Sequence, residues 1–401
     1  MSKTIFSAIE PAPADPILGV AVRFAADTRP FKVNLGVGAY LDENGKPVTL
    51  NVVRHEESKL AQTPGGCLHY YGPMSGNPTL RHATQELLFG ADSEILSSRR
   101  AATVQSLGGT GAIRLAADIL HTLCGCSVGA TSNPTWGNHN SILKAAGMTA
   151  VRYRYFNPAG GVDFSGLMQD LQSLPEKSVP ILHACCHNPT GYDLTQEQWK
   201  EVLSVCEKQH LIPLLDIAYQ GFGEGLKEDA MAVRLFAQSG IDFLVSSSFS
   251  KNFSLYGERV GALTVVTQSE SEAQKIISNA EALARSNYSN PPLHGARIVG
   301  NVLSDPQKKA DWEKEVTTMR ERIRNMRTAL SEAVEKAGAK RDFGFITQQK
   351  GMFSFTGFTP EQIERLEKEF GIYAVKNGRI CLCGLNAQNV QYVAESFAAV
   401  L

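Results

Sequence analysis

The chain has 401 residues, a formal net charge of −1, 20% charged residues and 43% hydrophobic residues. This near-neutral balance gives no electrostatic support to nucleic-acid binding or to a role at a membrane surface, and no apolar run reaches the length of a membrane-spanning helix. The length predicts two domains, or one large domain with a smaller companion.

The amino-terminal sequence MSKTIFSAIEPAPADP has neither the apolar core of a secretory signal nor the arginine-rich pattern of a transit peptide. We therefore expect a cytoplasmic protein. The eight cysteines lie in apolar stretches such as HTLCGC and ICLCGL, which is typical of reduced thiols in a core.

One cysteine cluster, HACCH, raises the question of a metal site. His183, Cys185, Cys186 and His187 could in principle bind zinc. No second ligand pair at zinc-finger spacing accompanies them, so the pattern favours the end of a buried strand. We expect no metal.

A phosphate-binding turn is predicted after the strand-like segment ATVQSL, which runs through GGTG into the helical segment AIRLAADILHTL. Glycines let the backbone approach a ligand, and the exposed N–H groups of a helix start suit a phosphate. A dinucleotide site has less support, because Arg114 stands where the G-x-G-x-x-G pattern needs its last glycine.

The middle of the chain alternates between short apolar strands and amphipathic helices, which predicts a parallel sheet covered on both faces. In the clearest unit, the strand VPILHACC is followed by the turn HNPTG, a helix over residues 195–210 and the strand LIPLLD. Thr195 caps the predicted helix, with Gln198 three residues further on. Asn188 and Asp216 then lie at the carboxyl ends of neighbouring strands, where open parallel sheets bind ligands.

Lys251 follows a third strand, FLVSSS, at the same expected edge, and Arg259 lies eight residues further on. Most lysines are solvated surface charges, which is the simpler interpretation of Lys251 taken by itself. The small hydroxyl residues and the second cation favour an anion site with a reactive amine. A lysine near other cations in a partly dry pocket shifts toward its neutral, nucleophilic form.

After about residue 310 the pattern changes to a long amphipathic helix, with apolar residues at spacings of three and four from Trp312 to Val334. The segment TPEQIERLEKEFG predicts a further helix that is capped by Thr359 and ends at Gly371. These helices indicate a second domain.

Pyridoxal 5'-phosphate would give each unusual residue a task. Lys251 would hold its aldehyde as an imine, and a buried Asp216 would keep the ring nitrogen protonated. The glycines, the hydroxyls and Arg259 would hold the phosphate. The alternative for Asp216 is a helix cap or a turn, but its position after LIPLL favours a site.

The ordered motifs VNLGVGAY, GGTGA, NPTWGNH, HACCHNPTG, DIAYQGFGEG, SFSKNFSLYGERVG, SNPPLHGARIV and GRICLCGL resemble those of the class I, fold type I aminotransferases, and among these the aspartate aminotransferases. The resemblance runs from about Asp15 to Leu401. It implies an α/β fold with a large domain, built on a mostly parallel central sheet flanked by helices, and a smaller α/β domain. The implied bounds are an amino-terminal arm over 1–14, a small domain over 15–47 and 311–401, and a large cofactor-binding domain over 48–310.

The resemblance implies that Lys251 binds the cofactor and moves the proton between the substrate α-carbon and the cofactor. It implies that Asp216 pairs with the pyridinium nitrogen, and that Tyr219 and Asn188 hydrogen-bond the phenolic oxygen of the ring. Trp136 would stack on the ring. The phosphate ligands that it implies are Gly109, Thr110, Ser248 and Arg259, with Ser250 as a further candidate and Tyr71 from the partner subunit.

For the substrate, the resemblance implies that Arg379 binds the α-carboxylate in bidentate fashion. Gly38 would lie over the substrate, Trp136 and Asn188 would also contact it, and Arg285 of the other subunit would bind the distal carboxylate. Arg285 by itself would be interpreted as a surface charge. Tyr288 stands where relatives commonly have tryptophan, which leaves room for aromatic substrates.

The predicted function is a homodimeric aminotransferase that exchanges an amino group between L-aspartate and 2-oxoglutarate, giving oxaloacetate and L-glutamate. Its partners would be small amino and keto dicarboxylic acids. The nearest alternative is an aromatic-amino-acid or broad-specificity aminotransferase. More distant alternatives are β-decarboxylation of aspartate on the same cofactor, a nicotinamide-dependent dehydrogenase and a non-catalytic binding protein.

Overall fold

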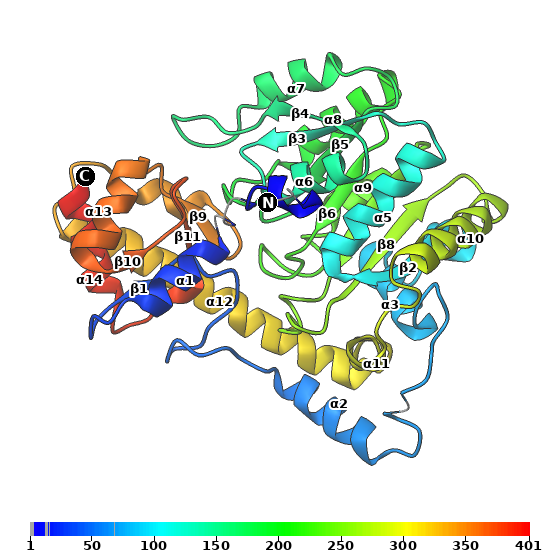
Figure 1. Cartoon of the computed structure of the whole chain (residues 1–401), viewed down its shortest axis with the longest axis horizontal. Coiled ribbons are helices and arrows are strands. Elements are labelled where there is room, and N and C mark those ends of the chain that lie inside the picture. Colours follow the sequence, from blue (N-terminus) through cyan, green and yellow to red (C-terminus); the bar gives the residue numbers. More distant parts are fainter. Residues whose placement is uncertain (1–3, 13–14, 16, 68) are drawn as a thin grey trace.

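The computed structural model describes residues 4–12, 15, 17–67 and 69–401. A seven-stranded sheet in the order β2-β8-β7-β6-β5-β3-β4 forms its centre (Figure 1). The strands are β2 (Ala101–Leu107), β3 (Val128–Asn133), β4 (Thr149–Arg154), β5 (Val179–His183), β6 (Leu214–Ile217), β7 (Phe243–Ser248) and β8 (Val260–Val266). Only β8 runs antiparallel to its neighbours β2 and β7, while the other pairs are parallel. The mostly parallel sheet is thus confirmed.

Helices cover both faces of this sheet (Figure 1). The helices of this part of the chain are α2 (Asn51–Gln62), α3 (Pro78–Phe89), α4 (Glu94–Ser97), α5 (Gly108–Thr122), α6 (Asn138–Ala145), α7 (Phe164–Gln172), α8 (Gln196–Lys208), α9 (Met231–Ala237), α10 (Glu270–Asn287) and α11 (His294–Ser304). Among them, α2 lies away from the sheet and packs against α11. Successive strand residues face opposite sides, so Leu214 packs in one core with α5, α6 and α10, while Leu215 packs in the other. Burial on both faces explains why the inner strands are rich in apolar residues, whereas the edge strand β4 carries exposed Arg152 and Arg154.

The predicted strand–helix–strand unit is confirmed, with two differences at its ends. Thr195 and Gln198 form a reciprocal capping box at the start of α8. β5 is shorter than predicted, since the chain has left the sheet before Cys186, whose φ is 51°. β6 begins only after Pro213, which has no N–H to donate to a sheet.

A second group of elements combines an early segment of the chain, with α1 and β1, and the carboxyl-terminal segment, and the two segments lie side by side in Figure 1. β1 (Val33–Asn34) pairs with β10 (Ile372–Tyr373), and β9 (Phe353–Phe355) pairs with β11 (Arg379–Cys381). The accompanying helices are α1 (Leu18–Ala26), α12 (Pro306–Lys336), α13 (Pro360–Phe370) and α14 (Val390–Val400), with short 3₁₀ turns η2 (Gly344–Gln348) and η3 (Leu382–Gly384).

The predicted helices of this group are present. α12 begins earlier than predicted, because the Asp305 side chain accepts hydrogen bonds from two amides and Pro306 occupies the first position. Thr359 caps α13, and Gly371 ends it with a left-handed φ of 68°.

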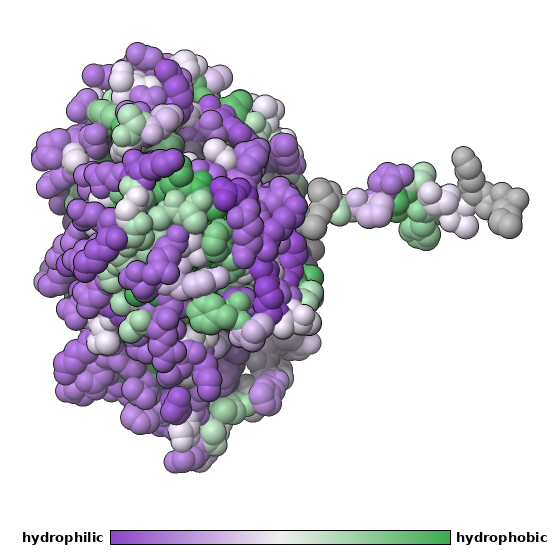
Figure 2. All heavy atoms as spheres, turned by 90° about the vertical axis from the view of Figure 1, so that its left-hand side faces the viewer, coloured by the Kyte–Doolittle hydropathy of each residue, from purple (hydrophilic) through white to green (hydrophobic). Residues whose placement is uncertain are grey.

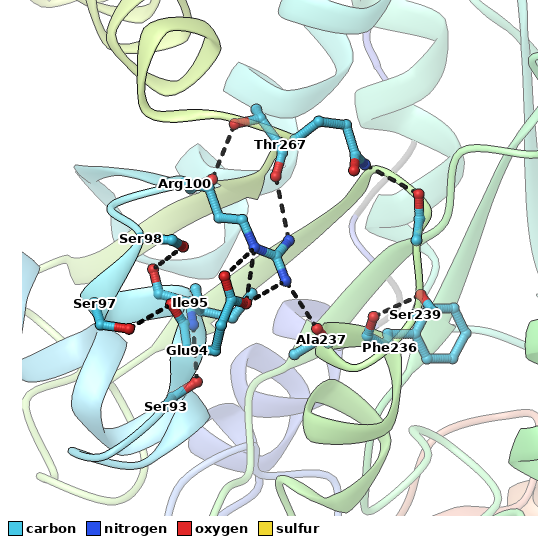
Figure 3. Close-up of polar contacts among 12 residues, drawn as sticks. Ser93, Glu94, Ile95, Ser97, Ser98, Arg100, Phe236, Ala237, Ser239 and Thr267 are labelled. Carbon is cyan, nitrogen blue, oxygen red and sulfur yellow. Dashed lines mark hydrogen bonds and ion pairs between the residues drawn. The ribbon is translucent and has the colours of Figure 1, made fainter.

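Arg100, which precedes the edge strand β2, connects three neighbouring segments by hydrogen bonds (Figure 3). Its guanidinium donates to Glu94 at 2.9 Å, to the Ala237 carbonyl at 3.1 Å and to the Thr267 carbonyl at 3.2 Å. One side chain therefore joins α4, the end of α9 and the segment after β8.

The described amino-terminal segment 4–12 projects from the body of the chain (Figure 2). It includes a 3₁₀ turn, η1 (Ile5–Ala8), and exposes Ile5, Phe6 and Ile9. No helix in the described part of the chain has both the length and the apolar character needed to cross a bilayer.

Candidate active site

A cavity of about 250 Å³ lies at the carboxyl edge of the central sheet. Residues of the second group of elements line its other side. Asn188 follows β5, Asp216 lies in β6 and Lys251 follows β7, as the sheet topology predicted. The predicted site residues that line this cavity are Gly38, Gly109, Thr110, Trp136, Asn188, Asp216, Tyr219, Ser248, Ser250, Lys251, Arg259 and Arg379.

Lys251 places its amine in this cavity. Its Nζ lies 4.9 Å from the centre of the Tyr219 ring. Burial lowers the pKa of Lys251 to about 8; Asp216 opposes this shift, and the positive charges of Arg259 and Arg379 add to it. The amine is therefore much closer to its neutral, nucleophilic form than an exposed lysine is.

Asp216 is a buried carboxylate held on one side only. Its Oδ2 lies 3.1 Å from Nε2 of His139, and Nδ1 of His139 lies 2.9 Å from Thr135 Oγ1. Burial acts to raise the pKa of Asp216, but the His139 contact and the nearby positive groups outweigh it, so the pKa is lowered. Asp216 Oδ1 has no hydrogen-bond partner among the described residues. It is available to a ligand.

The Tyr219 hydroxyl accepts a hydrogen bond of 3.3 Å from Asn188 Nδ2. Burial raises the pKa of Tyr219, so the phenol stays protonated at neutral pH. The two side chains therefore present paired polar groups to one region of the cavity.

The first turn of α5 and Arg259 form a positive cradle. Gly108 has a φ of 67°, and a Cβ atom there would lie 2.5 Å from the Arg259 guanidinium. That guanidinium donates to Ser250 Oγ at 3.3 Å and to the Tyr256 carbonyl at 3.0 Å. Since the first N–H groups of a helix lack intrahelical acceptors, Gly109 and Thr110 can bind an anion beside Arg259.

Arg379, the first residue of β11, places a second cation in the cavity from the other group of elements. Only 3% of Arg379 is exposed, and its guanidinium lies over the Phe353 ring at 4.2 Å. It donates to the Gly36 carbonyl at 3.0 Å, while its Nε has no partner within the described residues. The Nε–H group of Arg379 is therefore available to a carboxylate.

Several cavity residues were missed by the sequence analysis. They are Ile17, Ala218, Tyr256 and Phe353, together with His139 behind Asp216. His183, which the sequence suggested only as a possible zinc ligand, also lines the cavity. His139 lies in the motif NPTWGNH, so its position near Trp136 was a signal. Phe353 lies in an ordinary apolar stretch that gave none.

Two predicted residues lie outside the cavity of this chain. Tyr71 is 81% exposed, and Arg285 is exposed in the last turn of α10, where it donates to Ser289. Tyr288 is partly buried, and its hydroxyl has no partner in the described part of the chain.

The HACCH cluster does not form one ligand set in the described residues. His183 groups with His139 and Asp216 at the cavity, whereas Cys185 and Cys186 group with Asp229. The ring nitrogens of His187 contact Ser132 and Thr190 instead.

Comparison with known proteins agrees with this geometry. Residues 30–397 match the family of class I and II aminotransferases. The chain belongs to this family. The family resemblance and the fold that we expected from the sequence are thereby confirmed.

Similar members of the aminotransferase family cover 99% or more of this chain. An aspartate aminotransferase of Pseudomonas aeruginosa is 51% identical over 401 residues, which is 99% of this chain and all of the relative. The aromatic-amino-acid aminotransferase of Escherichia coli is 45% identical over 99% of this chain and all of the relative. The structure of an aromatic-amino-acid aminotransferase from Burkholderia pseudomallei, covalently bound to pyridoxal phosphate, superposes with a TM-score of 0.96 at 49% identity and covers all of both chains.

Proposed function

We propose that this aminotransferase uses pyridoxal 5'-phosphate to exchange an amino group between L-aspartate and 2-oxoglutarate. The observation that carries the proposal is the meeting of three groups in one cavity: the Lys251 amine, the free oxygen of Asp216 and the free Nε of Arg379. They come from separate parts of the sequence. The aspartate aminotransferase of P. aeruginosa, 51% identical, supports the choice of substrate.

The residues of the cavity fit this cofactor. Asp216 Oδ1 is buried and unpartnered within the described chain, as a carboxylate would be that pairs with a protonated ring nitrogen. Gly109, Thr110 and Arg259 suit a phosphate, and the Lys251 amine suits an aldehyde. The bound cofactor supplies an aldehyde that takes up the amino group and a ring that withdraws electrons from the reacting carbon.

The chain itself orients the substrate and moves a proton. Arg379 would bind the α-carboxylate through its guanidinium, which fixes the α-carbon relative to Lys251. Lys251, with a pKa of about 8, can take up and return the α-proton near neutral pH. Trp136, Phe353 and Ile17 line the same space and help to exclude water.

The domain bounds also belong to this proposal. We assign residues 15–47 and 311–401 to a small domain and 48–310 to a large domain. The pairing of β1 with β10 supports this division, because it joins the two sequence segments of the small domain. Gly38 would then reach the substrate from the small domain, and closure of that domain would cover the cavity.

We also propose a homodimer in which Tyr71 and Arg285 complete the site of the neighbouring chain. In support, both are exposed and both lie outside the cavity of their own chain. Among the described residues, the cations that line this cavity are Lys251, Arg259 and Arg379, and the proposal gives each of them another role. Arg285 would therefore supply the cation that binds a distal carboxylate.

Aromatic amino acids are the second candidate substrates. The aromatic aminotransferases of E. coli and B. pseudomallei are 45% and 49% identical to this chain, and Tyr288 departs from the common tryptophan. Steady-state kinetics would compare kcat/KM for aspartate and for tyrosine with 2-oxoglutarate as acceptor. A higher kcat/KM for aspartate supports the proposal, whereas a higher value for tyrosine replaces it with the aromatic activity. The cytoplasmic location stays a prediction that cell fractionation would check.

A further inference from the structure

A second cavity, of about 390 Å³, lies away from the active site, and none of its lining residues lines the active-site cavity. Its walls are the 222–224 loop that follows β6, one face of α12 and the 347–351 segment, which begins within η2. It is therefore built from both groups of elements.

The charge of this second cavity is strongly positive. Three arginines of α12, Arg320, Arg324 and Arg327, line it together with Lys350, and Glu224 is the one carboxylate among its described lining residues. Their spacing of four and three places the arginines on one helix face. Four cations against one carboxylate leave a net charge of +3.

Glu224 neutralises only part of this charge. It pairs with Arg324 at 3.2 Å and with Lys350 at 3.1 Å. Arg320 instead donates to the Gly221 carbonyl at 3.0 Å and to the Thr317 hydroxyl at 3.3 Å. Arg320 and Arg327 thus have no ion pair with any carboxylate that the structure describes.

Arg327 is the most unusual member of the group, since it is only 4% exposed. Its guanidinium donates to the Gly351 carbonyl at 2.6 Å and to the Phe353 carbonyl at 3.1 Å. Burial lowers the pKa of Arg327 to about 10. Carbonyl dipoles offset such a buried cation less completely than a counter-ion does.

A purely structural role would explain Arg327 as a link between α12 and the segment that leads into β9. It would not explain why Arg320 lines the same hollow without a counter-ion in the described chain, or why four cations there share the single carboxylate of Glu224, since like charges repel unless an anion lies between them. We propose that this cavity is a binding site for a small polyanion that carries phosphate or carboxylate groups. The arginine forks match the geometry of both groups, and the volume admits a molecule larger than a single phosphate ion.

The site also has a physical link to the active site. The Phe353 carbonyl accepts from Arg327, and the Phe353 ring lies under the Arg379 guanidinium. A polyanion bound to Arg327 would therefore act on Phe353, whose ring supports Arg379.

Isothermal titration calorimetry of the cofactor-loaded enzyme tests the proposal, with inorganic pyrophosphate and citrate as separate probes. Two variants alter the cavity in opposite directions. Arg324→Gln removes a ligand, whereas Glu224→Gln removes the competing carboxylate. Arg365→Gln and Glu369→Gln are matched controls, because this pair on α13 forms a similar exposed ion pair at 2.9 Å outside the cavity.

We expect one site per chain for at least one probe, and the tighter probe identifies the preferred anionic group. Arg324→Gln should weaken binding about tenfold, the size expected for one charge-assisted hydrogen bond. Glu224→Gln should tighten binding about threefold or more, and the two controls should bind like the unaltered enzyme. Absence of binding by both probes, or equal affinity in the two cavity variants, would overturn the proposal.

Discussion

The Nε2 atom of His139 lies 3.1 Å from Oδ2 of Asp216, although 77 residues separate the two in the sequence. This contact satisfies one carboxylate oxygen and leaves Oδ1 without a described partner inside the cavity. A carboxylate held in this way is oriented before any ligand arrives, so it can stabilise a positive charge without reorganisation.

The first prediction concerns this carboxylate. Asp216→Ala should retain the cofactor, since Lys251 and the phosphate cradle remain, but should lose transamination by about 100-fold or more because a buried counter-charge is removed. Asp216→Glu should be milder. Bound cofactor is measured by absorbance, and the rate is measured in a single turnover. A rate for Asp216→Ala close to that of the unaltered enzyme would show that the carboxylate is only structural.

The second prediction concerns the pH at which Lys251 reacts. Only the neutral amine attacks an aldehyde, and the pKa of Lys251 is about 8. The rate at which cofactor-free enzyme takes up pyridoxal phosphate covalently should therefore rise with pH and reach half of its maximum near pH 8. Stopped-flow absorbance measures this rate. A midpoint near 10.5, the ordinary lysine value, would contradict the prediction.

Two controls accompany this measurement. Arg379→Gln removes a nearby positive charge that lowers the pKa of Lys251, so the midpoint should move to higher pH. Borohydride reduction followed by peptide mapping should place the label on Lys251 in the unaltered enzyme. A label on another lysine would sink the assignment.

The third prediction tests the shared active site. Arg285→Ala should impair dicarboxylic substrates far more than aromatic ones, since only the former lose a charge-assisted partner. Lys251→Ala chains refolded together with Arg285→Ala chains should regain activity toward aspartate, because one site of each mixed dimer joins an intact Lys251 to an intact Arg285. With random assortment, about a quarter of all sites should be restored. Mixed dimers without recovery would place Arg285 elsewhere.

The fourth prediction concerns stability rather than chemistry. Thr195→Ala removes the side chain that accepts from the Gln198 amide in the capping box of α8. The free energy of unfolding should fall by about 1 kcal/mol, as for other N-cap threonines. Chemical denaturation of the cofactor-loaded enzyme measures the change, and Thr195→Ser serves as control because it keeps the oxygen. An equal loss in both variants would show that the methyl group matters, not the cap.

Features that depend on near neighbours in the chain could be predicted from the sequence. The caps at Thr195 and Thr359 and the stop at Gly371 could each be predicted, because a few adjacent residues fix the local hydrogen bonds. The strand FLVSSS could be predicted from its short apolar run. The edge shared by Asn188, Asp216 and Lys251 followed as well, since parallel strands bring their carboxyl ends together.

Contacts between side chains that are distant in the sequence could not be predicted, because they depend on the packing of the folded chain. His139 contacts Asp216, and Phe353 lies under Arg379. The local sequence of each element does not predict which other element it packs against. The cluster of Arg320 and Arg327 with Lys350 likewise looks like ordinary surface charge until α12 packs beside the 347–351 segment. The physical reason is that hydrophobic burial, which drives this packing, is non-directional, so the pairs it brings together depend on the shape of the whole chain.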